Sequence, residues 1–321
     1  MIERLVRPVA TRLVRPEWAT RVVSPAYDSV RPVDRAALMA RDPYVFLHVT
    51  RSPGDADDGA TPEEVTEQNA KALEWLLDEG VFTDLLPPSL YLYQLRVDEH
   101  VQVGIVADVH LSGVEDGRIG PHERIQPQRA THLADHISRV GANSSPVAFG
   151  YEDDEVIDAI VAEVVAREPL LDFERGDQLT QTVWVVPAEH QATICERLAQ
   201  HRLYIVDGHH RVSAGVENWR RSDFADEAGY VLGAIFPVGQ LHVSSFHRRV
   251  PDLNGHDERS LCDAIAARDF SVRPVRPDED PTPAAPGVFG MYVEGAWYAL
   301  EPFRVHPAEF DATVLQDRIL G

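Results

Sequence analysis

Apolar residues recur every three to four positions in several stretches of the chain, and this spacing predicts amphipathic helices. The clearest helix begins at Thr61, where a capping threonine and a proline precede two glutamates, and it ends at Gly80. A second strong pattern, over residues 153–167, places isoleucine and valine side chains along one face. Weaker patterns predict further helices over residues 32–41, 128–139, 188–200 and 307–320.

Short runs rich in β-branched and aromatic residues predict strands. Residues 90–97 and 101–109 are joined by a short polar turn, which is typical of an antiparallel hairpin, and 288–293 with 296–300 form a second such pair. The Pro- and Asp-rich stretch 273–286 predicts a surface linker. The order of helices and strands predicts a mixed α+β protein. Other runs predict single strands over residues 44–49, 145–151, 182–186, 203–206, 230–236 and 241–244.

The composition is that of a globular protein. The 321 residues are 44% hydrophobic and 26% charged, enough for one large domain or two ordinary ones. Because the apolar runs are too short to cross a bilayer and the N-terminus lacks an apolar signal core, we expect a cytoplasmic protein outside the membrane. Cys195 and Cys262, both in helical patterns, are expected to be buried thiols rather than a disulfide.

The charge of the chain excludes some partners and one class of phosphate site. Net charge is −22, and a surface this negative repels nucleic acid unless a basic patch overrides it; no such patch is evident. Lys71 is the only lysine, which excludes a phosphate-binding loop that needs a lysine after its last glycine. A phosphate would have to be held by arginine, histidine, backbone amides or a metal ion.

The richest group of polar residues is Asp207-Gly208-His209-His210-Arg211. An apolar run precedes it and a helical pattern follows it, so the motif is predicted to form a strand-to-helix turn. Glycine allows an otherwise strained backbone, and the first amides of the helix offer an anion site. The arginine fork can grip a phosphate, and the aspartate can bind the Mg²⁺ that bridges nucleotide phosphates. The alternative is that the two histidines cap a helix or hold a structural zinc.

Other histidines have metal-ligand spacing. His132 and His136 lie four apart on a predicted helix, but no glutamate follows the first and no third ligand is evident. A solvated helix face is therefore the favoured interpretation. The same interpretation applies to a grouping of His190, His201 and His210.

The motif resembles that of the ParB/sulfiredoxin-like superfamily and, within it, of the free L-serine kinases. From about residue 22 to 321 the chain is similar to the bacterial domain-of-unknown-function family numbered 1015. The resemblance implies a ParB/sulfiredoxin-like core over 116–250, after an N-terminal α/β region over 1–115 and before a C-terminal helix–hairpin–helix extension over 251–321. The segments that carry it are 24–28, 44–49, 121–123, 141–147, 207–211, 246–248 and 314–316.

Three chemistries of the superfamily can be compared with these residues. Sulfiredoxins have a cysteine at the position of His209, and ParB-type nucleotide switches resemble Gly-Glu-Arg-Arg there and belong to DNA-binding chains. The serine kinases carry the same five residues as this chain. They also have an upstream glutamate that often follows Pro-His, as in Pro121-His122-Glu123.

The kinase resemblance implies a role for each residue of the motif. Glu123 would accept the proton of the substrate hydroxyl, Asp207 would hold Mg²⁺, and the phosphates of ATP or ADP would lie against residues 208–211 and His122. A solvated loop acid is the alternative for Glu123. The acceptor would be a free hydroxy amino acid, with L-serine as the first expectation.

The sequence indicates less clearly which residues would recognise the amino acid. His247, Arg248 and Arg249 offer cations for its carboxylate, although a surface arginine pair is usually solvated. Asn143 and Ser144 offer polar groups to a ligand, or form a plain turn.

Two other functions remain open at this point. The protein could bind nucleotide without turnover, as a regulator of the ParB-like kind, or it could hydrolyse nucleotide without an acceptor. The sequence specifies neither the phosphoryl donor nor the oligomeric state.

Overall fold

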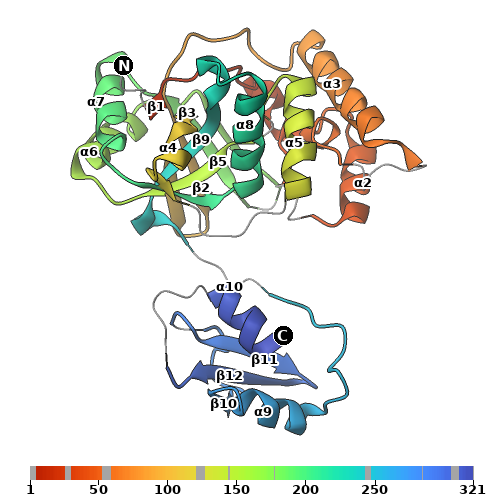
Figure 1. The fold of residues 1–321 in the computed structure, drawn as a ribbon. Helices are drawn as coiled ribbons and strands as arrows, with labels where there is room; N and C mark the ends of the chain where they lie inside the picture. The colour runs from red at the N-terminus through yellow and green to blue at the C-terminus, as the bar shows by residue number, and fades with distance from the viewer. Residues whose placement is uncertain are drawn as a thin grey trace. The chain divides into compact units, whose positions relative to one another are not determined.

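The computed structural model describes residues 5–25, 30–52, 59–120, 127–143, 145–176, 178–242, 247–283, 285–304 and 311–320. It is a mixed α+β structure, as the sequence predicted, and divides into two compact units, Met1–Leu241 and His242–Gly321 (Figure 1). The large sheet of the first unit takes strands from both sides of residue 115. The three-part division at residues 115 and 250 stays a prediction.

Within the described residues, the first unit is built on a nine-stranded mixed sheet. The strand order is β4-β8-β5-β9-β3-β2-β7-β6, with β1 paired to β3. The pairs β4–β8 and β5–β9 are parallel, and the others are antiparallel. The strands are β1 (Val6–Arg7), β2 (Tyr91–Val97), β3 (His100–His110), β4 (Ile119–Gly120), β5 (Val147–Tyr151), β6 (Leu171–Glu174), β7 (Thr180–Val185), β8 (Leu203–Asp207) and β9 (Tyr230–Pro237).

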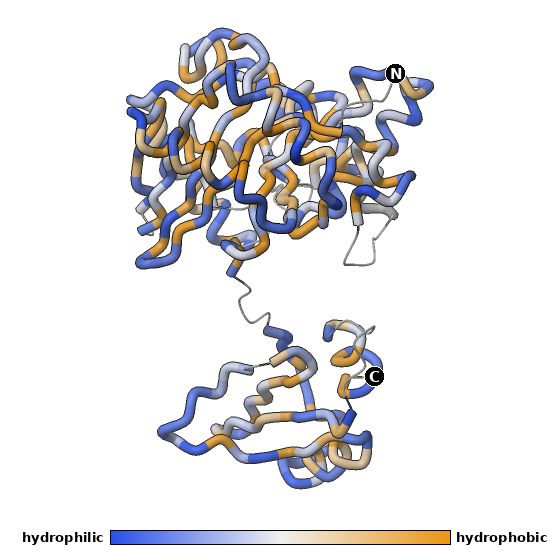
Figure 2. The backbone as a smooth tube through the Cα atoms, turned by 90° about the vertical axis from the view of Figure 1, so that its left-hand side faces the viewer, coloured by the Kyte–Doolittle hydropathy of each residue, from blue (hydrophilic) through white to orange (hydrophobic). Residues whose placement is uncertain are grey.

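One face of this sheet packs against α6 (Glu155–Val165), α7 (Ala188–Leu198) and α8 (His209–Arg221). Strand pairing places Leu92 and Ile105 on this face, where they join the apolar side chains of the three helices in one core. In Figure 2, much of the tube inside the first unit is orange, that is hydrophobic, and many of its outer turns are blue, that is hydrophilic. Burial of this face explains why the strand patterns were legible in the sequence.

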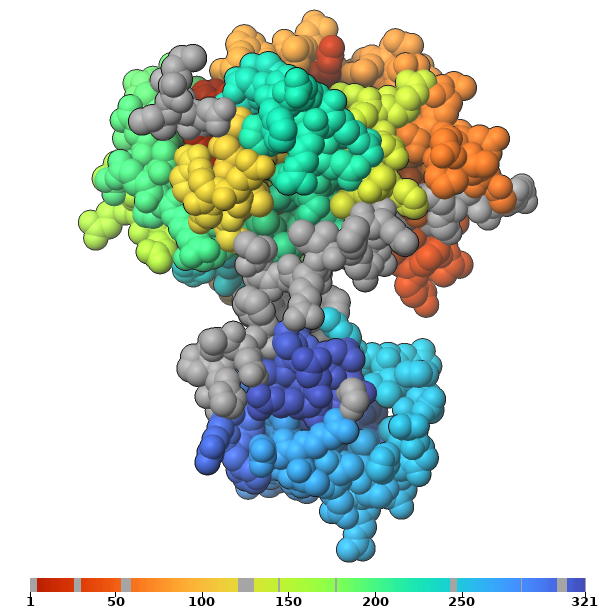
Figure 3. Space-filling model, viewed as in Figure 1, coloured from red at the N-terminus to blue at the C-terminus, as the bar shows by residue number. Residues whose placement is uncertain are grey.

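Three helices lie side by side on the first unit: α3 (Pro62–Asp78), α5 (Pro127–Val140) and α8 (Figures 1 and 3). α3 begins as predicted, with the Thr61 side chain and Glu64 forming a capping box. α5 is tied to α8 because the Asn218 amide donates to the carbonyl of Ala134 at 3.0 Å.

The interface between α3 and α5 corrects the expectation for His136, which is only 9% exposed. Its Nδ1 lies 3.4 Å from the amide nitrogen of Asn69, a fully buried residue of α3 that also donates to the carbonyl of Arg51. Burial lowers the pKa of His136. His132 is exposed as expected, so only one of the pair lies on a solvated face.

Two predicted strands are wrong where the structure describes them. Residues 44–49 contain the 3₁₀ helix Phe46–His48: Val45, Leu47 and Val49 alternate in burial, but they pair with no strand among the described residues. Leu241 and His242 are not in a strand, and the rest of the predicted strand 241–244 lies outside the described residues.

Some elements were not anticipated, chiefly very short ones. The strands β1, β4 and β6 have two to four residues, too few for a clear period of two. In the first unit, α2 (Pro32–Arg41) has its predicted range. The short helices α1 (Ala19–Val22) and α4 (Ser112–Glu115) were not predicted, nor were the 3₁₀ segments at Pro16–Trp18, Asp226–Gly229 and Val238–Gln240.

The second unit contains a three-stranded antiparallel sheet in the order β10-β12-β11 within the described residues. The hairpin β11 (Phe289–Val293) and β12 (Ala296–Pro302) was predicted, whereas β10 (Phe270–Pro274) was not. The stretch 273–286, predicted as a linker, instead provides the end of β10 and the connection to β11. The helices are α9 (Glu258–Ala266) and α10 (Asp311–Val314), the latter continued by a π-helical segment Leu315–Leu320.

The two cysteines lie in different units, and neither is part of a disulfide. Cys195 is buried in α7, and Cys262 is partly buried in α9, where burial raises its pKa. No helix in the described part of the chain is both long and apolar enough to cross a membrane.

Candidate functional site

Three segments meet at one edge of the large sheet because of the directions in which their strands run. β4 and β8 are parallel, so the chain leaves Gly120 toward the same edge as Asp207. β5 is antiparallel to β8, and Asp207 is paired with Ala148 near the start of β5. Ser145 and Pro146, which precede β5, therefore lie at the edge where β8 ends.

The central motif forms the predicted strand-to-helix turn at this edge. β8 ends at Asp207, Gly208 adopts the left-handed conformation (φ 98°, ψ 27°), and α8 begins at His209. No described side chain caps this helix, whereas Asp154 caps α6 with hydrogen bonds to two backbone amides. The first amides of α8 consequently have no partner within the helix and form a potential anion site.

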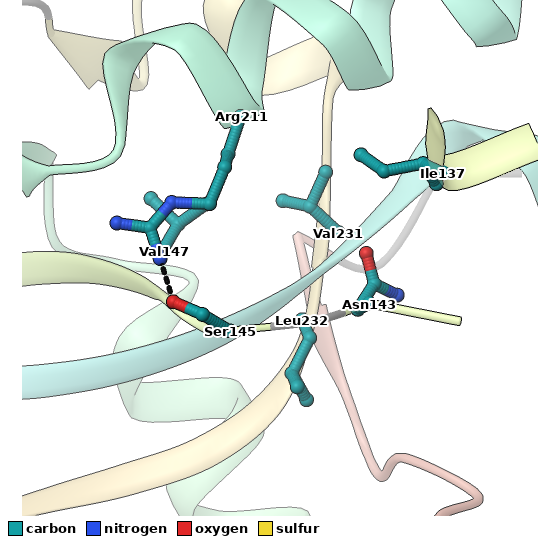
Figure 4. A pocket seen from close by; sticks show the side chains of 7 residues that line it. All are labelled: Ile137, Asn143, Ser145, Val147, Arg211, Val231 and Leu232. Atoms are coloured by element: carbon teal, nitrogen blue, oxygen red, sulfur yellow. Dashed lines mark hydrogen bonds between the residues drawn. The ribbon is translucent and has the colours of Figure 1, made fainter. Parts of the chain in front are cut away.

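Arg211 connects the two strands that border the turn. Its Nη1 donates to the carbonyl of Pro146 at 2.7 Å and to the hydroxyl of Ser145, and its Nη2 donates to the Asp207 carboxylate. Figure 4 shows Arg211 and Ser145 pointing toward each other from α8 and the start of β5. These contacts hold the guanidinium in place. Arg211 therefore links the two strands and also contributes a positive charge to the site.

The two histidines differ in environment. His209 is 6% exposed, and its carbonyl accepts a hydrogen bond from Ser213 at 3.0 Å. His210 is partly buried, and its Nδ1 is shielded from solvent without a hydrogen-bond partner among the described residues. A buried ring nitrogen in this state calls for a water or a ligand atom, because leaving it unsatisfied costs about 1–3 kcal/mol.

A small recess lies beside Arg211 (Figure 4). Asn143 and Ser145 line it together with four aliphatic side chains. Its volume is about 10 Å³, enough for about one water molecule. The aliphatic residues are Ile137, Val147, Val231 and Leu232.

Asp207 is positioned to meet a ligand, since its side chain is 65% exposed. Among the described residues, no group of three or more His, Cys, Asp or Glu side chains could hold a metal ion. A single carboxylate nevertheless suits Mg²⁺, which keeps several waters and takes its other ligands from phosphate oxygens. The residues present therefore fit a metal that arrives with a nucleotide better than a metal held by protein alone.

The structure describes only some of the other predicted site residues. His122, Glu123 and Ser144 lie outside the described residues. The predicted substrate cations at residues 247–249 are exposed in the second unit, and the structure does not place them relative to Asp207.

A second polar cluster, which the sequence did not suggest, lies at the opposite end of β8. The fully buried Asp154 carboxylate accepts from Arg197 Nε at 2.8 Å and from His201 Nε2 at 2.9 Å. Burial raises the pKa of Asp154, but these hydrogen bonds and two backbone amides outweigh it and hold the pKa well below its usual range. The only sequence signal was an aspartate before a helix, which indicates a cap and not its partners.

Comparison with known proteins gives one match. The sequence model of the family described as "Protein of unknown function (DUF1015)" matches residues 6–317. No curated protein and no solved structure shows significant similarity to the chain.

Proposed function

We propose that this chain, which belongs to the family of unknown function DUF1015, is a metal-dependent kinase that phosphorylates a free hydroxy amino acid. The family description names no activity, so the proposal rests on the site and on the resemblance of its motif to the serine kinases. L-Serine is the proposed acceptor, and ATP or ADP the phosphoryl donor.

The observation that carries the proposal is the start of α8. It combines uncapped backbone amides, a left-handed Gly208 and the shielded, unpartnered Nδ1 of His210. Amides and a ring nitrogen that can donate when protonated form a set that suits an anion. A phosphate bound there would give the His210 Nδ1 a partner, which it lacks among the described residues.

Asp207 and Arg211 add the charges that distinguish a nucleotide site from a simple anion site. A Mg²⁺ ion bound with the nucleotide would neutralise charge on the phosphate oxygens, and the exposed Asp207 carboxylate would hold it. Arg211 uses three of the five guanidinium N–H donors in the hydrogen bonds to Ser145, Pro146 and Asp207. Two donors remain for a phosphate.

The described ends of segment 121–126 support a role for Glu123. Gly120 pairs with Tyr204 in parallel, so the chain leaves β4 toward the edge that carries Asp207. At the other end, Pro127 begins α5, which packs against α8. Glu123 follows Gly120 by three positions in the chain, as Asp207 follows its partner Tyr204.

The proposed reaction is a direct transfer. The hydroxyl oxygen of the acceptor forms a bond to the terminal phosphorus while the bond from that phosphorus to the nucleotide breaks, and Glu123 takes the hydroxyl proton. The products are a phosphorylated amino acid and ADP from ATP, or AMP from ADP. Asn143, which lines the recess beside Arg211, is a proposed recognition group for the amino acid, together with Ser144 and residues 247–249.

One observation favours a second candidate, a nucleotide-binding regulator without turnover. The recess beside Arg211 has a volume of about 10 Å³, too small for an amino acid. If no acceptor pocket forms when nucleotide binds, the protein holds the nucleotide and transfers nothing.

A mass-spectrometric transfer assay separates these candidates. Protein, Mg²⁺, ATP or ADP, and L-serine or a panel of other hydroxylated metabolites are incubated together. We expect O-phosphoserine from the natural chain and at least a hundredfold less from Asp207→Asn and Glu123→Gln. Asp78→Asn and Glu74→Gln, exposed acids of α3, are the matched controls and should retain the activity.

The negative outcomes are also informative. Nucleotide binding that weakens with Asp207→Asn, without transfer to any acceptor, would establish the regulator instead. Phosphate release without an acceptor would indicate hydrolysis. Absence of nucleotide binding would overturn both the kinase and the regulator.

A further inference from the structure

A groove of about 300 Å³ lies on the first unit, far from the motif at the end of β8. Its floor is formed by Leu171 and Phe173 of β6 and Gln181 of β7. In the strand order, β7 is five positions from β8, which corresponds to about 24 Å across the sheet. The volume falls at the lower end of the range of small-molecule sites, about 300–1,000 Å³.

The groove lies on the sheet face opposite the one that carries α6, α7 and α8. Trp184 belongs to the core under those helices, and Gln181, three residues earlier on the same strand, faces the other way. The register confirms the shared floor, because Phe173 is directly opposite Gln181. Residues that precede α2 form the walls of the groove, together with Phe46 and Phe82. Most of these side chains are apolar.

Gln181 is a polar group in this apolar lining. It is 8% exposed, and its Oε1 accepts a hydrogen bond from the Tyr93 hydroxyl at 2.6 Å. Burial raises the pKa of Tyr93 to about 12, so the phenol stays protonated at neutral pH and remains the donor. This bond directs the amide oxygen to Tyr93 and leaves the amide N–H groups without a partner among the described residues.

Arg12 provides a charge on the same groove. It is exposed, its Nη1 donates to the carbonyl of Thr83 at 2.9 Å, and it makes no ion pair with any described acid. No aspartate or glutamate is among the described lining residues. In a chain of net charge −22, the described lining thus offers an anion the Gln181 amide donors and the Arg12 cation.

We propose that this groove binds a small carboxylic acid with an apolar body. The carboxylate accepts from the Gln181 amide and the Arg12 guanidinium, and the hydrocarbon part packs against Leu171, Phe173 and the walls. A neutral apolar molecule would leave the Gln181 donors unsatisfied, and a cation would meet Arg12. The site is separate from the proposed kinase site and does not depend on it.

Octanoate is a suitable probe, compared with 1-octanol and octylamine, which have the same chain length. We expect octanoate to bind in titration calorimetry and to raise the unfolding temperature, because a ligand that binds only the folded state stabilises it. Octanol should bind at least tenfold more weakly, and octylamine should not bind.

Substitutions test the two polar contacts. Gln181→Leu and Arg12→Gln should each weaken octanoate binding about tenfold or more, since hydrogen bonds to a charged group are the stronger ones. Gln94→Leu, on the opposite face of β2, and Arg15→Gln, outside the groove, should bind like the natural chain. Unfolding curves of each variant without ligand verify that the fold is retained.

Three results would overturn the proposal. They are no octanoate binding at millimolar concentration, equal affinity for octanoate and octanol, or binding that Gln181→Leu and Arg12→Gln leave unchanged in folded protein.

Discussion

The Arg211 side chain folds back over Gly208, so that its Nε lies 2.8 Å from where a Cβ on that glycine would stand. Gly208 also has a positive φ of 98°. Two independent constraints therefore require glycine at this turn: the backbone conformation and the close approach of the arginine. The second constraint links the turn to the Ser145–Pro146 segment, because the same guanidinium donates to both residues.

Gly208→Ala should lower the free energy of unfolding more than a positive φ alone explains. The left-handed conformation costs alanine about 1–2 kcal/mol. In addition, the new methyl group displaces Arg211 from its acceptors, and we expect a further loss of about 1–2 kcal/mol. Urea unfolding measures the sum of the two losses.

Gly117→Ala is the matched control for that change. Gly117 has a φ of 81°, and no atom lies within 4 Å of where its methyl carbon would stand, so its substitution reports the backbone cost alone. Equal losses at the two glycines would show that Arg211 is not held against the turn.

Arg211→Lys keeps the charge but should weaken both the fold and the binding of nucleotide. A lysine ammonium cannot reach Ser145, Pro146 and Asp207 with the geometry of a planar fork. We expect a loss of about 1 kcal/mol in unfolding free energy and about tenfold in ATP affinity. Arg220→Lys, exposed on the same helix, should change neither, and a similar effect at both positions would contradict the bracing role.

His136 should make stability depend on pH near neutrality. Its pKa is lowered by burial in the folded protein, so the unfolded chain binds the proton more readily, and stability falls as pH drops below about 6.5. The slope approaches about 1.4 kcal/mol per pH unit. His136→Gln, which still offers a hydrogen-bonding group to Asn69, should flatten this dependence in urea unfolding between pH 7.5 and 5.5.

His132→Gln is the control on the same helix. His132 is exposed, so this variant should keep the pH dependence of the natural chain. If instead His132→Gln flattens the pH dependence of stability and His136→Gln does not, the buried histidine is not the source of that dependence.

Asp154 should govern stability in acid. Its pKa is depressed in the folded state, so its stabilisation is present above the ordinary aspartate value of about 3.9 and is lost as pH falls below it. Asp154→Asn leaves Arg197 and His201 without a carboxylate and should cost about 3–5 kcal/mol at pH 7. The difference from the natural chain should shrink toward pH 2, while Asp78→Asn should show no difference at either pH.

The sequence predicted those helices and turns that are determined by residues close together in the chain. The helix from Pro62 was legible because Thr61 and Glu64 cap it within four residues. The turn at Gly208 was legible because a strand pattern ends and a helix pattern begins beside a glycine. Both signals depend on residues that are neighbours in the chain.

The remaining features depend on contacts between distant segments. Arg211 finds its acceptors at residues 145 and 146, which lie 66 and 65 positions earlier, and nothing in the sequence indicates that pairing. His136 is buried because α3 covers that side of α5, so the helical pattern alone misplaced it. The alternation of Val45, Leu47 and Val49 predicted a strand because burial, and not pairing, sets such a pattern.

The distribution of the two cysteines has a practical consequence. Because Cys195 lies in the first unit and Cys262 in the second, each unit carries a single built-in chemical reporter. A thiol reagent added along a urea gradient, followed by peptide mass analysis, would read the opening of the two units separately in one sample. Whether the units unfold as one cooperative block or in succession is therefore measurable on the natural chain, without any substitution or attached dye.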